Sequence, residues 1–171
     1  MPFKMFPDTK LSLNWAFFRK LTVNPDEGGM LALTACSMEP SNLAVDSTSS
    51  PGKYKVVKES FTLTVRVAKS SWVMKSATTN SAESKRLLNH ERTHYLLASC
   101  VAWELYLQIR AVEETSVARL QVRLNELRTA AAKRVQELSD QYDRETNHGK
   151  ISTKQQAWDL RIEKWDQSQS L

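Results

Sequence analysis

Residues 87–100 read LLNHERTHYLLASC and lie in the part of the chain that decides its fold. Residues 80–140 contain neither glycine nor proline, whereas all five prolines and three of the four glycines lie before residue 53. Because these two residue types interrupt helices, residues 80–140 are predicted to be helical and the region before them to contain strands and turns. Within the quoted stretch, residues 90–94 form the pattern H-E-x-x-H.

The helical region is expected to divide into an antiparallel hairpin. Asn80 and Glu83 form a capping-box pattern, which predicts a helix that begins near Ser81. An unbroken helix over residues 81–140 would be about 90 Å long at about 1.5 Å per residue. We therefore expect a break at residues 113–116 (EETS), since Thr and Ser favour helix caps over helix interiors.

The N-terminal region carries strand signals. The clearest is an alternation of apolar and more polar residues, with apolar side chains at Phe61, Leu63, Val65 and Val67. A period of two is typical of a strand with one solvated face. Weaker strand patterns occur at residues 11–15 and at residues 30–35, after the turn signal Gly28-Gly29. Residues 40–53, which contain DSTSSPG, are predicted to form a loop.

These patterns predict an α+β fold. A small N-terminal antiparallel sheet would pack on a C-terminal helical hairpin that carries H-E-x-x-H, followed by a short C-terminal helix. That last helix is expected to begin near Ser152, with Gln155 as its capping-box partner. A length of 171 residues fits a single domain over 1–171, mainly strands in 1–75 and mainly helices in 80–171.

The composition excludes several classes of protein. Hydrophobic residues make up 41% and charged residues 25%, which is ordinary for a soluble globular protein. The net charge of +5 is spread without a basic stripe, so no nucleic-acid partner is expected. No apolar run is long enough for a transmembrane segment, and no signal peptide is expected in this chain. Two cysteines, Cys36 and Cys100, do not make a disulfide framework.

H-E-x-x-H on a helix predicts a zinc site. Residues four apart lie on one helix face, so His90 and His94 can direct ring nitrogens at one ion. Glu91 can reach a water bound to that ion and take a proton from it. The simpler alternative is that these are two ordinary helix histidines, without a metal.

A catalytic zinc takes three protein ligands and a water, so a third ligand is required. Glu104 and Glu114 are excluded because they would lie about 15 Å and about 30 Å beyond His94 along the same rigid helix. The ligand must therefore come from another element.

The segment YDRETNHG, residues 142–149, supplies the candidates. The return helix should bring this segment back to the level of the motif, and Gly149 permits a sharp turn there. His148 is the preferred third ligand, with Asp143 and Glu145 as alternatives. Asp143 has a further possible role as a hydrogen-bond partner that orients a ligand histidine. The simpler alternative for His148 is a residue at the helix C-terminus that interacts with the helix dipole.

The chain resembles a bacterial family of predicted secreted zinc-dependent proteases, long catalogued as a domain of unknown function. The resemblance rests on LNWAFF (13–18), ALT (32–34), SWV (71–73), LLNHERTHY (87–95), YDRETNHG (142–149) and QQAW (155–158). It implies metal-dependent peptide hydrolysis, a zincin-like domain and a secreted or periplasmic location. The chain departs from the family at Arg92-Thr93, where a glycine before the second histidine is common.

The mechanism expected on this basis is that of a zinc metallopeptidase acting on a peptide or protein, with Zn2+ held by His90, His94 and His148. Glu91 would act as general base and then as acid, and Tyr142 would donate a hydrogen bond to the oxyanion. The strand at 61–67 could pair with an extended substrate if it lies at a sheet edge. The rival hypothesis is a non-catalytic domain that binds metal or presents its helices to a protein partner. Cobalt or nickel would also suit three nitrogen ligands.

Overall fold

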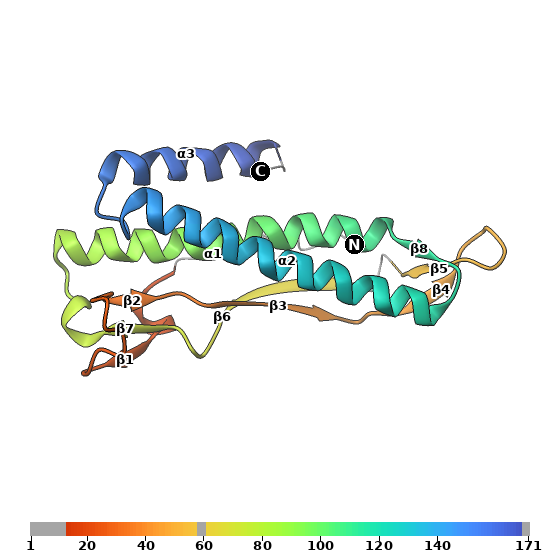
Figure 1. Cartoon of the computed structure of the whole chain (residues 1–171), viewed down its shortest axis with the longest axis horizontal. Helices are drawn as coiled ribbons and strands as arrows, with labels where there is room; N and C mark the ends of the chain where they lie inside the picture. Colours follow the sequence, from red (N-terminus) through yellow and green to blue (C-terminus); the bar gives the residue numbers. More distant parts are fainter. Residues whose placement is uncertain (1–12, 58–60, 169–171) are drawn as a thin grey trace.

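The computed structural model describes residues 13–57 and 61–168 and has the predicted α+β architecture. Its helices are α1 (Ala82–Ala111), α2 (Val117–Thr146) and α3 (Ser152–Ser168). Figure 1 shows α1 and α2 lying lengthwise together, with the strands along one side of α1 and α3 along another. The long helix α1 is therefore the centre of the fold, and it is buried by three different neighbours.

The boundaries of α1 and α2 confirm the predicted hairpin. The side chain of Ser81 accepts a hydrogen bond from the backbone N–H of Ser84, so the helix begins where expected, although its cap is Ser81 rather than Asn80. Between the helices, Glu113–Glu114 form the short strand β8. Ser116 then caps α2 by accepting from the backbone N–H of Arg119. The break thus lies within residues 113–116, as predicted.

One face of α2 packs into the core at helical spacing. Its buried residues are Leu120, Leu124, Ala131, Leu138, Tyr142 and Thr146. The other faces of α2 are largely exposed and carry intrahelical ion pairs such as Arg123–Glu126. Because the buried stripe continues to the last turn, it fixes the position of the residues that follow Leu138 against α1.

The strands form three small sheets rather than the single antiparallel sheet expected. In the first, β7 (Trp72–Met74) pairs in parallel with β1 (Arg19–Leu21) and antiparallel with β2 (Ala32–Leu33). In the second, β3 (Cys36–Ser41) pairs antiparallel with β6 (Thr62–Val67).

The third sheet lies beside the turn between α1 and α2. In it, β5 (Tyr54–Val56) pairs antiparallel with β4 (Val45–Ser47) on one side and with β8 on the other. The strand β8 comes from the helical hairpin, so this sheet ties the N-terminal strands to the connection between the two long helices.

The strand at residues 61–67 is confirmed, whereas one strand prediction and one loop prediction are corrected. In β6, Leu63 and Val65 are buried against α1, and the ring of Phe61 just before it stacks on Tyr106. Trp15 lies in a 3-10 turn, Trp15–Phe17, instead of a strand, and Leu11 lies outside the described residues. Residues 40–53 are not one loop, because they include the end of β3 and all of β4.

The third helix begins at Ser152, as predicted, and buries Trp158, Ile162 and Trp165. The role predicted for Gln155 is wrong. Its side chain is buried and hydrogen-bonds to Tyr142, Thr93 and Asp159 instead of capping the helix. Among the described residues, no helix is both long and apolar enough to cross a membrane.

The packing of α2 predicts that alanine substitutions at two positions on that helix will have very different effects on stability. Leu120 is fully buried, so Leu120→Ala should lower the free energy of unfolding by about 2–5 kcal/mol through loss of burial and formation of a cavity. Val122 is 58% exposed, so Val122→Ala should change the free energy of unfolding by less than about 0.5 kcal/mol. Urea denaturation measures both, and equal effects would contradict the assignment of the buried face.

Candidate metal centre

The two histidines of H-E-x-x-H point together into the interior between α1 and the end of α2. Both are buried, and their Nε2 atoms are 3.3 Å apart. The ring of His90 stacks on the ring of Tyr142 with 4.6 Å between centroids, which fixes the orientation of that imidazole. The ring of His94 meets the same tyrosine edge-on at 5.0 Å. One aromatic residue of α2 therefore holds both rings in place.

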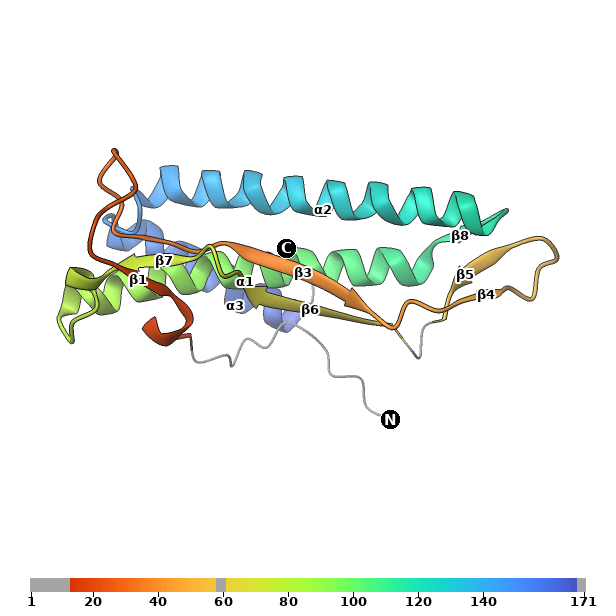
Figure 2. The same cartoon turned by 90° about the horizontal axis from the view of Figure 1, so that it is seen from below.

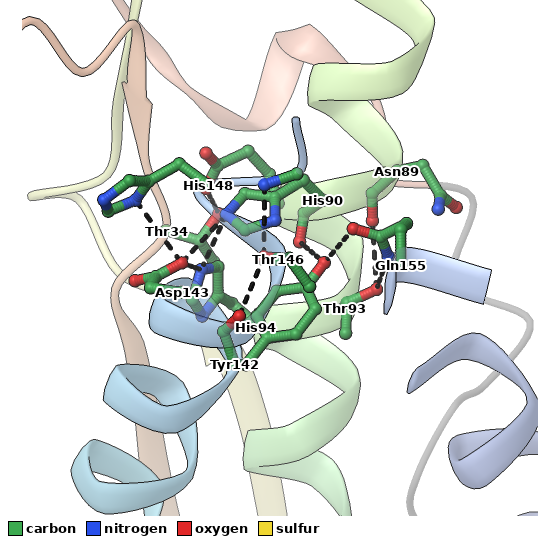
Figure 3. A network of polar contacts seen from close by, with 12 residues as sticks. Thr34, Asn89, His90, Thr93, His94, Tyr142, Asp143, Thr146, His148 and Gln155 are labelled. Carbon is green, nitrogen blue, oxygen red and sulfur yellow. Dashed lines mark hydrogen bonds and ion pairs between the residues drawn. The ribbon is translucent and has the colours of Figure 1, made fainter. Parts of the chain in front are cut away.

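Asp143 brings a carboxylate to the same two nitrogens. Its Oδ1 lies 3.0 Å from His90 Nε2 and 3.1 Å from His94 Nε2. Figure 3 shows the three side chains directed toward one another. Burial raises the pKa of Asp143, but the hydrogen bonds and charges of the two imidazoles outweigh burial and hold that pKa well below its usual range. For His94, burial lowers the pKa, and the hydrogen bond with Asp143 together with nearby acidic charges makes the net shift upward.

His148 joins the cluster from the turn after α2. Its Nδ1 lies 3.6 Å from Asp143 Oδ1, and its side chain is 48% exposed. Asn147, His148 and Gly149 have successive positive φ angles of 48°, 51° and 74°, a left-handed segment that turns the chain back toward α1. Non-glycine residues adopt such angles at a cost, and that cost is typical of functional sites. His90, Asp143 and His148 each offer a ligand atom, and these atoms lie within 4.8 Å of one another.

Gly149 is required where it lies. A Cβ atom added at this position would be 2.9 Å from His90 Cβ and 3.1 Å from His90 Nδ1. The backbone of Gly149 is also held from both sides, because its N–H donates to Thr146 Oγ1 and its carbonyl accepts from Arg86. The turn therefore closes directly over the first histidine of the motif.

Glu91 is buried beside the cluster and has a partner that the sequence did not reveal. Thr34, in the connection between β2 and β3, donates a hydrogen bond of 2.6 Å to Glu91 Oε2. Burial, together with the negative charge of Glu91, raises the pKa of Cys36 to about 12. Neither cysteine is in a disulfide, and Cys100 is fully buried.

Tyr142 does not present its hydroxyl to the cluster. The side chain is fully buried, and its hydroxyl donates to Gln155 Oε1 and lies 3.4 Å from the backbone carbonyl of His90. Burial raises the pKa of this hydroxyl above its usual value. The face that Tyr142 offers to the two histidines is its ring, so the geometry does not support the expected role as oxyanion donor.

The other acidic candidates lie apart from the cluster. Glu145 accepts hydrogen bonds from Trp158 and Gln141, Glu104 pairs with Arg134, and Glu114 pairs with Arg119. Of the alternatives to His148 considered from the sequence, only Asp143 reaches the histidines.

A second buried network lies behind the site. Gln155 Nε2 donates to Thr93 Oγ1 and to Asp159 Oδ1, and Asn89 donates to the other oxygen of Asp159. The contacts with Thr93 and Asn89 join residues 62 and 70 positions apart, so no local pattern could have shown them. They attach α3 to the back of the helix that carries H-E-x-x-H.

The cluster opens on a cleft of about 1240 Å³. All four candidate ligands and Glu91 line it, together with parts of β3 and of α2. The candidate metal centre is thus buried on the side of α3 and accessible on the side of the cleft.

Comparison with known proteins places the chain in a family. Residues 6–149 match the family described as bacterial protein of unknown function, DUF922. The chain belongs to this family. The match ends at Gly149 and so contains the whole cluster, whereas α3 follows it in the chain. No curated protein and no solved structure matches.

The close approach of Gly149 to His90 predicts an unequal effect of two identical substitutions. Gly52→Ala and Gly149→Ala both place a side chain at a positive φ, 73° and 74°, at a cost of about 1–2 kcal/mol. Nothing lies within 4 Å of the added Cβ at Gly52, whereas at Gly149 it would overlap His90. The Gly149 variant should therefore lose about 1–3 kcal/mol more. Urea denaturation tests this, and equal losses would show that the turn relaxes without disturbing the site.

Proposed function

We propose that the chain is a zinc-dependent metallopeptidase whose metal is held by residues of H-E-x-x-H and of the segment 142–149. The observation that carries the proposal is the convergence of His90, His94, Asp143 and His148 on one point in the wall of a cleft. Glu91, a buried carboxylate that is not among the proposed ligands, lines the same cleft.

The donor set fits zinc in type and in spacing. Imidazole nitrogens and carboxylate oxygens are usual zinc ligands. Two nitrogens bound tetrahedrally at about 2.0–2.1 Å are separated by about 3.3–3.4 Å. The Nε2 atoms of His90 and His94 are 3.3 Å apart, and Asp143 Oδ1 completes a triangle with sides of 3.0 and 3.1 Å.

Asp143 is favoured over His148 as the third ligand. A carboxylate that merely orients a ligand histidine binds the ring nitrogen that faces away from the metal. Asp143 instead lies against Nε2 of both histidines, the nitrogens that would bind the ion. His148 is more distant and half exposed, so we place it at the margin of the site, where it would contact the fourth ligand or the substrate.

In this proposal, different residues of the chain have different roles in peptide hydrolysis. Zinc bound here would polarise the scissile carbonyl and lower the pKa of a bound water. Glu91 accepts the proton of the attacking water and later returns it to the leaving amine. Thr34 keeps the Glu91 carboxylate directed into the cleft through its 2.6 Å hydrogen bond. The ring of Tyr142 positions the two histidines, and no oxyanion role is assigned to its hydroxyl.

A structural metal site is the second candidate, favoured by the number of donors. If all four side chains bound one ion, no coordination position would be left for water, as in closed zinc sites. The half-exposed His148 would then complete the shell. The two candidates differ in whether His148 is needed to hold the metal and in whether the protein hydrolyses peptides.

The ligand assignment predicts different zinc contents for single variants. Wild-type protein should hold about one zinc per chain after dialysis, measured by elemental mass spectrometry. Asp143→Ala should bind zinc at least tenfold more weakly, because it removes a direct ligand. His148→Ala should keep its zinc. Asp140→Ala, which removes an exposed carboxylate one turn earlier, is the matched control and should behave as wild type. Loss of zinc from His148→Ala alone would reverse the assignment.

The catalytic role of Glu91 predicts loss of activity without loss of metal. Glu91→Gln keeps the shape of the side chain and its hydrogen bond with Thr34, so zinc content should be unchanged. Its kcat on a quenched fluorescent peptide should fall about 10²–10⁴-fold, the usual contribution of a general base. Glu104→Gln, on the same helix but paired with Arg134, should hydrolyse the peptide at the wild-type rate. Undiminished hydrolysis by Glu91→Gln would exclude the mechanism, and absence of hydrolysis by zinc-loaded wild type would favour the structural site.

A further inference from the structure

The cleft is much longer than the metal cluster. Along α1 its lining extends from Glu83 to Ile109, with His90 and His94 between them. At about 1.5 Å per residue, the cleft continues about 10 Å from His90 toward the start of the helix and about 22 Å from His94 toward its end. A site for a small ligand or for a chain terminus would be closed close to the metal, whereas this cleft runs past it on both sides.

One wall of the longer arm is the edge of a β-sheet. In the part of the chain that the structure describes, β3 pairs only with β6, and in Figure 2 β3 lies between β6 and α2. The hydrogen bond from Ala68 N–H to the carbonyl of Ala35 sets the phase of this antiparallel ladder. Residues alternate in such a ladder, so Cys36, Met38 and Pro40 direct their backbone groups away from β6. These three residues line the cleft.

Pro40 supports this orientation independently. Proline has no backbone N–H, and within sheets it is confined to edge strands and bulges. At residue 40 the missing N–H lies on the outer edge, where the ladder with β6 loses nothing. The outer edge of β3 therefore offers two N–H groups, at Cys36 and Met38, and three carbonyls.

The opposite wall of the cleft, across from β3, is formed by one face of α2. Besides the half-buried Val135, Ser139 and Asp143, six residues of this helix line the cleft at helical spacing, and they are polar or small: Asn125, Arg128, Thr129, Ala132, Gln136 and Asp140. All six are exposed. The floor between the walls is apolar, formed by Ala98, Leu105 and Ile109 of α1. The longer arm is thus a groove with an apolar floor, a polar helix on one side and open backbone groups on the other.

We infer that this groove binds an internal segment of an extended polypeptide, which adds to the outer edge of β3 as a further strand and passes over the metal cluster. This inference rests on the proposed function and specifies its substrate as a polypeptide cleaved within the chain. At about 3.3 Å per residue, about three residues fit on the short side of the cluster and about six on the long side. An extended backbone satisfies the edge of β3. A helix has no free backbone groups along its length to do so.

Two identical substitutions on α2 test the groove. Ala132 and Ala130 are both exposed, but only Ala132 lines the cleft. A tryptophan at residue 132 would fill the long arm, whereas one at residue 130 would extend into solvent. The two variants are compared on quenched peptides of twelve and four residues, of which only the longer reaches Ala132. Ala132→Trp should lower kcat/KM for the twelve-residue peptide at least tenfold and leave the four-residue peptide unaffected, while Ala130→Trp should match wild type on both.

A binding experiment tests the groove without requiring the protein to hydrolyse the peptide. Glu91→Gln protein is titrated into a fluorescently labelled twelve-residue peptide, and binding is followed by anisotropy. The same peptide is also N-methylated at alternate backbone positions, in either of two phases. Alternate N–H groups of an extended strand point to opposite edges, so only one of the two phases removes the donors that would face β3. Methylation in one of the two alternate phases should weaken binding at least tenfold, and methylation in the other phase should not.

The outcomes separate the groove from the reaction. If the twelve-residue peptide binds in this phase-dependent way but wild type cleaves neither peptide, the groove is established and the peptidase proposal fails. If wild type cleaves both peptides with equal kcat/KM, and Ala132→Trp equals Ala130→Trp, hydrolysis stands and the groove is overturned. Equal binding of all methylated peptides would also overturn pairing with β3.

Discussion

The candidate site depends on the register of α2 against α1, and Tyr142 fixes that register. Its ring lies between the two histidines of H-E-x-x-H and Trp158 of α3, fully buried. Burial of a hydroxyl is costly unless it is hydrogen-bonded, and Gln155 meets that need. A slip of α2 by one residue would therefore leave a buried hydroxyl without a partner and carry Asp143 away from His90. The packing of the Tyr142 side chain therefore also determines whether the cluster assembles.

The left-handed turn after α2 adds a second constraint. Three successive residues with positive φ are held by contacts made on both sides, from Arg86 of α1 and from Thr146 at the end of α2. Positive φ costs glycine little, so the strain lies at Asn147 and His148. Such strain persists only where the surroundings over-determine the backbone, at about 1–3 kcal/mol for each residue. Here it brings an imidazole to the open side of the cluster. The same turn also covers His90, and the cluster opens on the cleft.

The parts of the structure that the sequence predicted are those with local signals. The helix boundaries near Ser81 and Ser116 follow from short caps, and β6 follows from a period of two. The strands within residues 40–53 were missed because Ser, Pro and Gly there indicate a loop, while pairing with distant strands decides the outcome. Gln155 was misread because its spacing from Ser152 matches a capping box, but the buried Tyr142 competes for its side chain. Thr34 could not be found at all, since 57 residues separate it from Glu91.

Glu91 bears most directly on the choice between a catalytic and a structural metal. A structural site needs its ligands and little else, and burial of a carboxylate that binds no metal destabilises the fold unless something offsets it. Glu91 is 3% exposed, and a threonine on another element donates a hydrogen bond to it. Its place is beside the cluster and in the wall of a cleft that continues past the cluster in both directions. The proposed proton transfer, at the point where a polypeptide would cross the site, would give a role to a carboxylate kept there at a cost in stability, whereas a closed structural site would give it none.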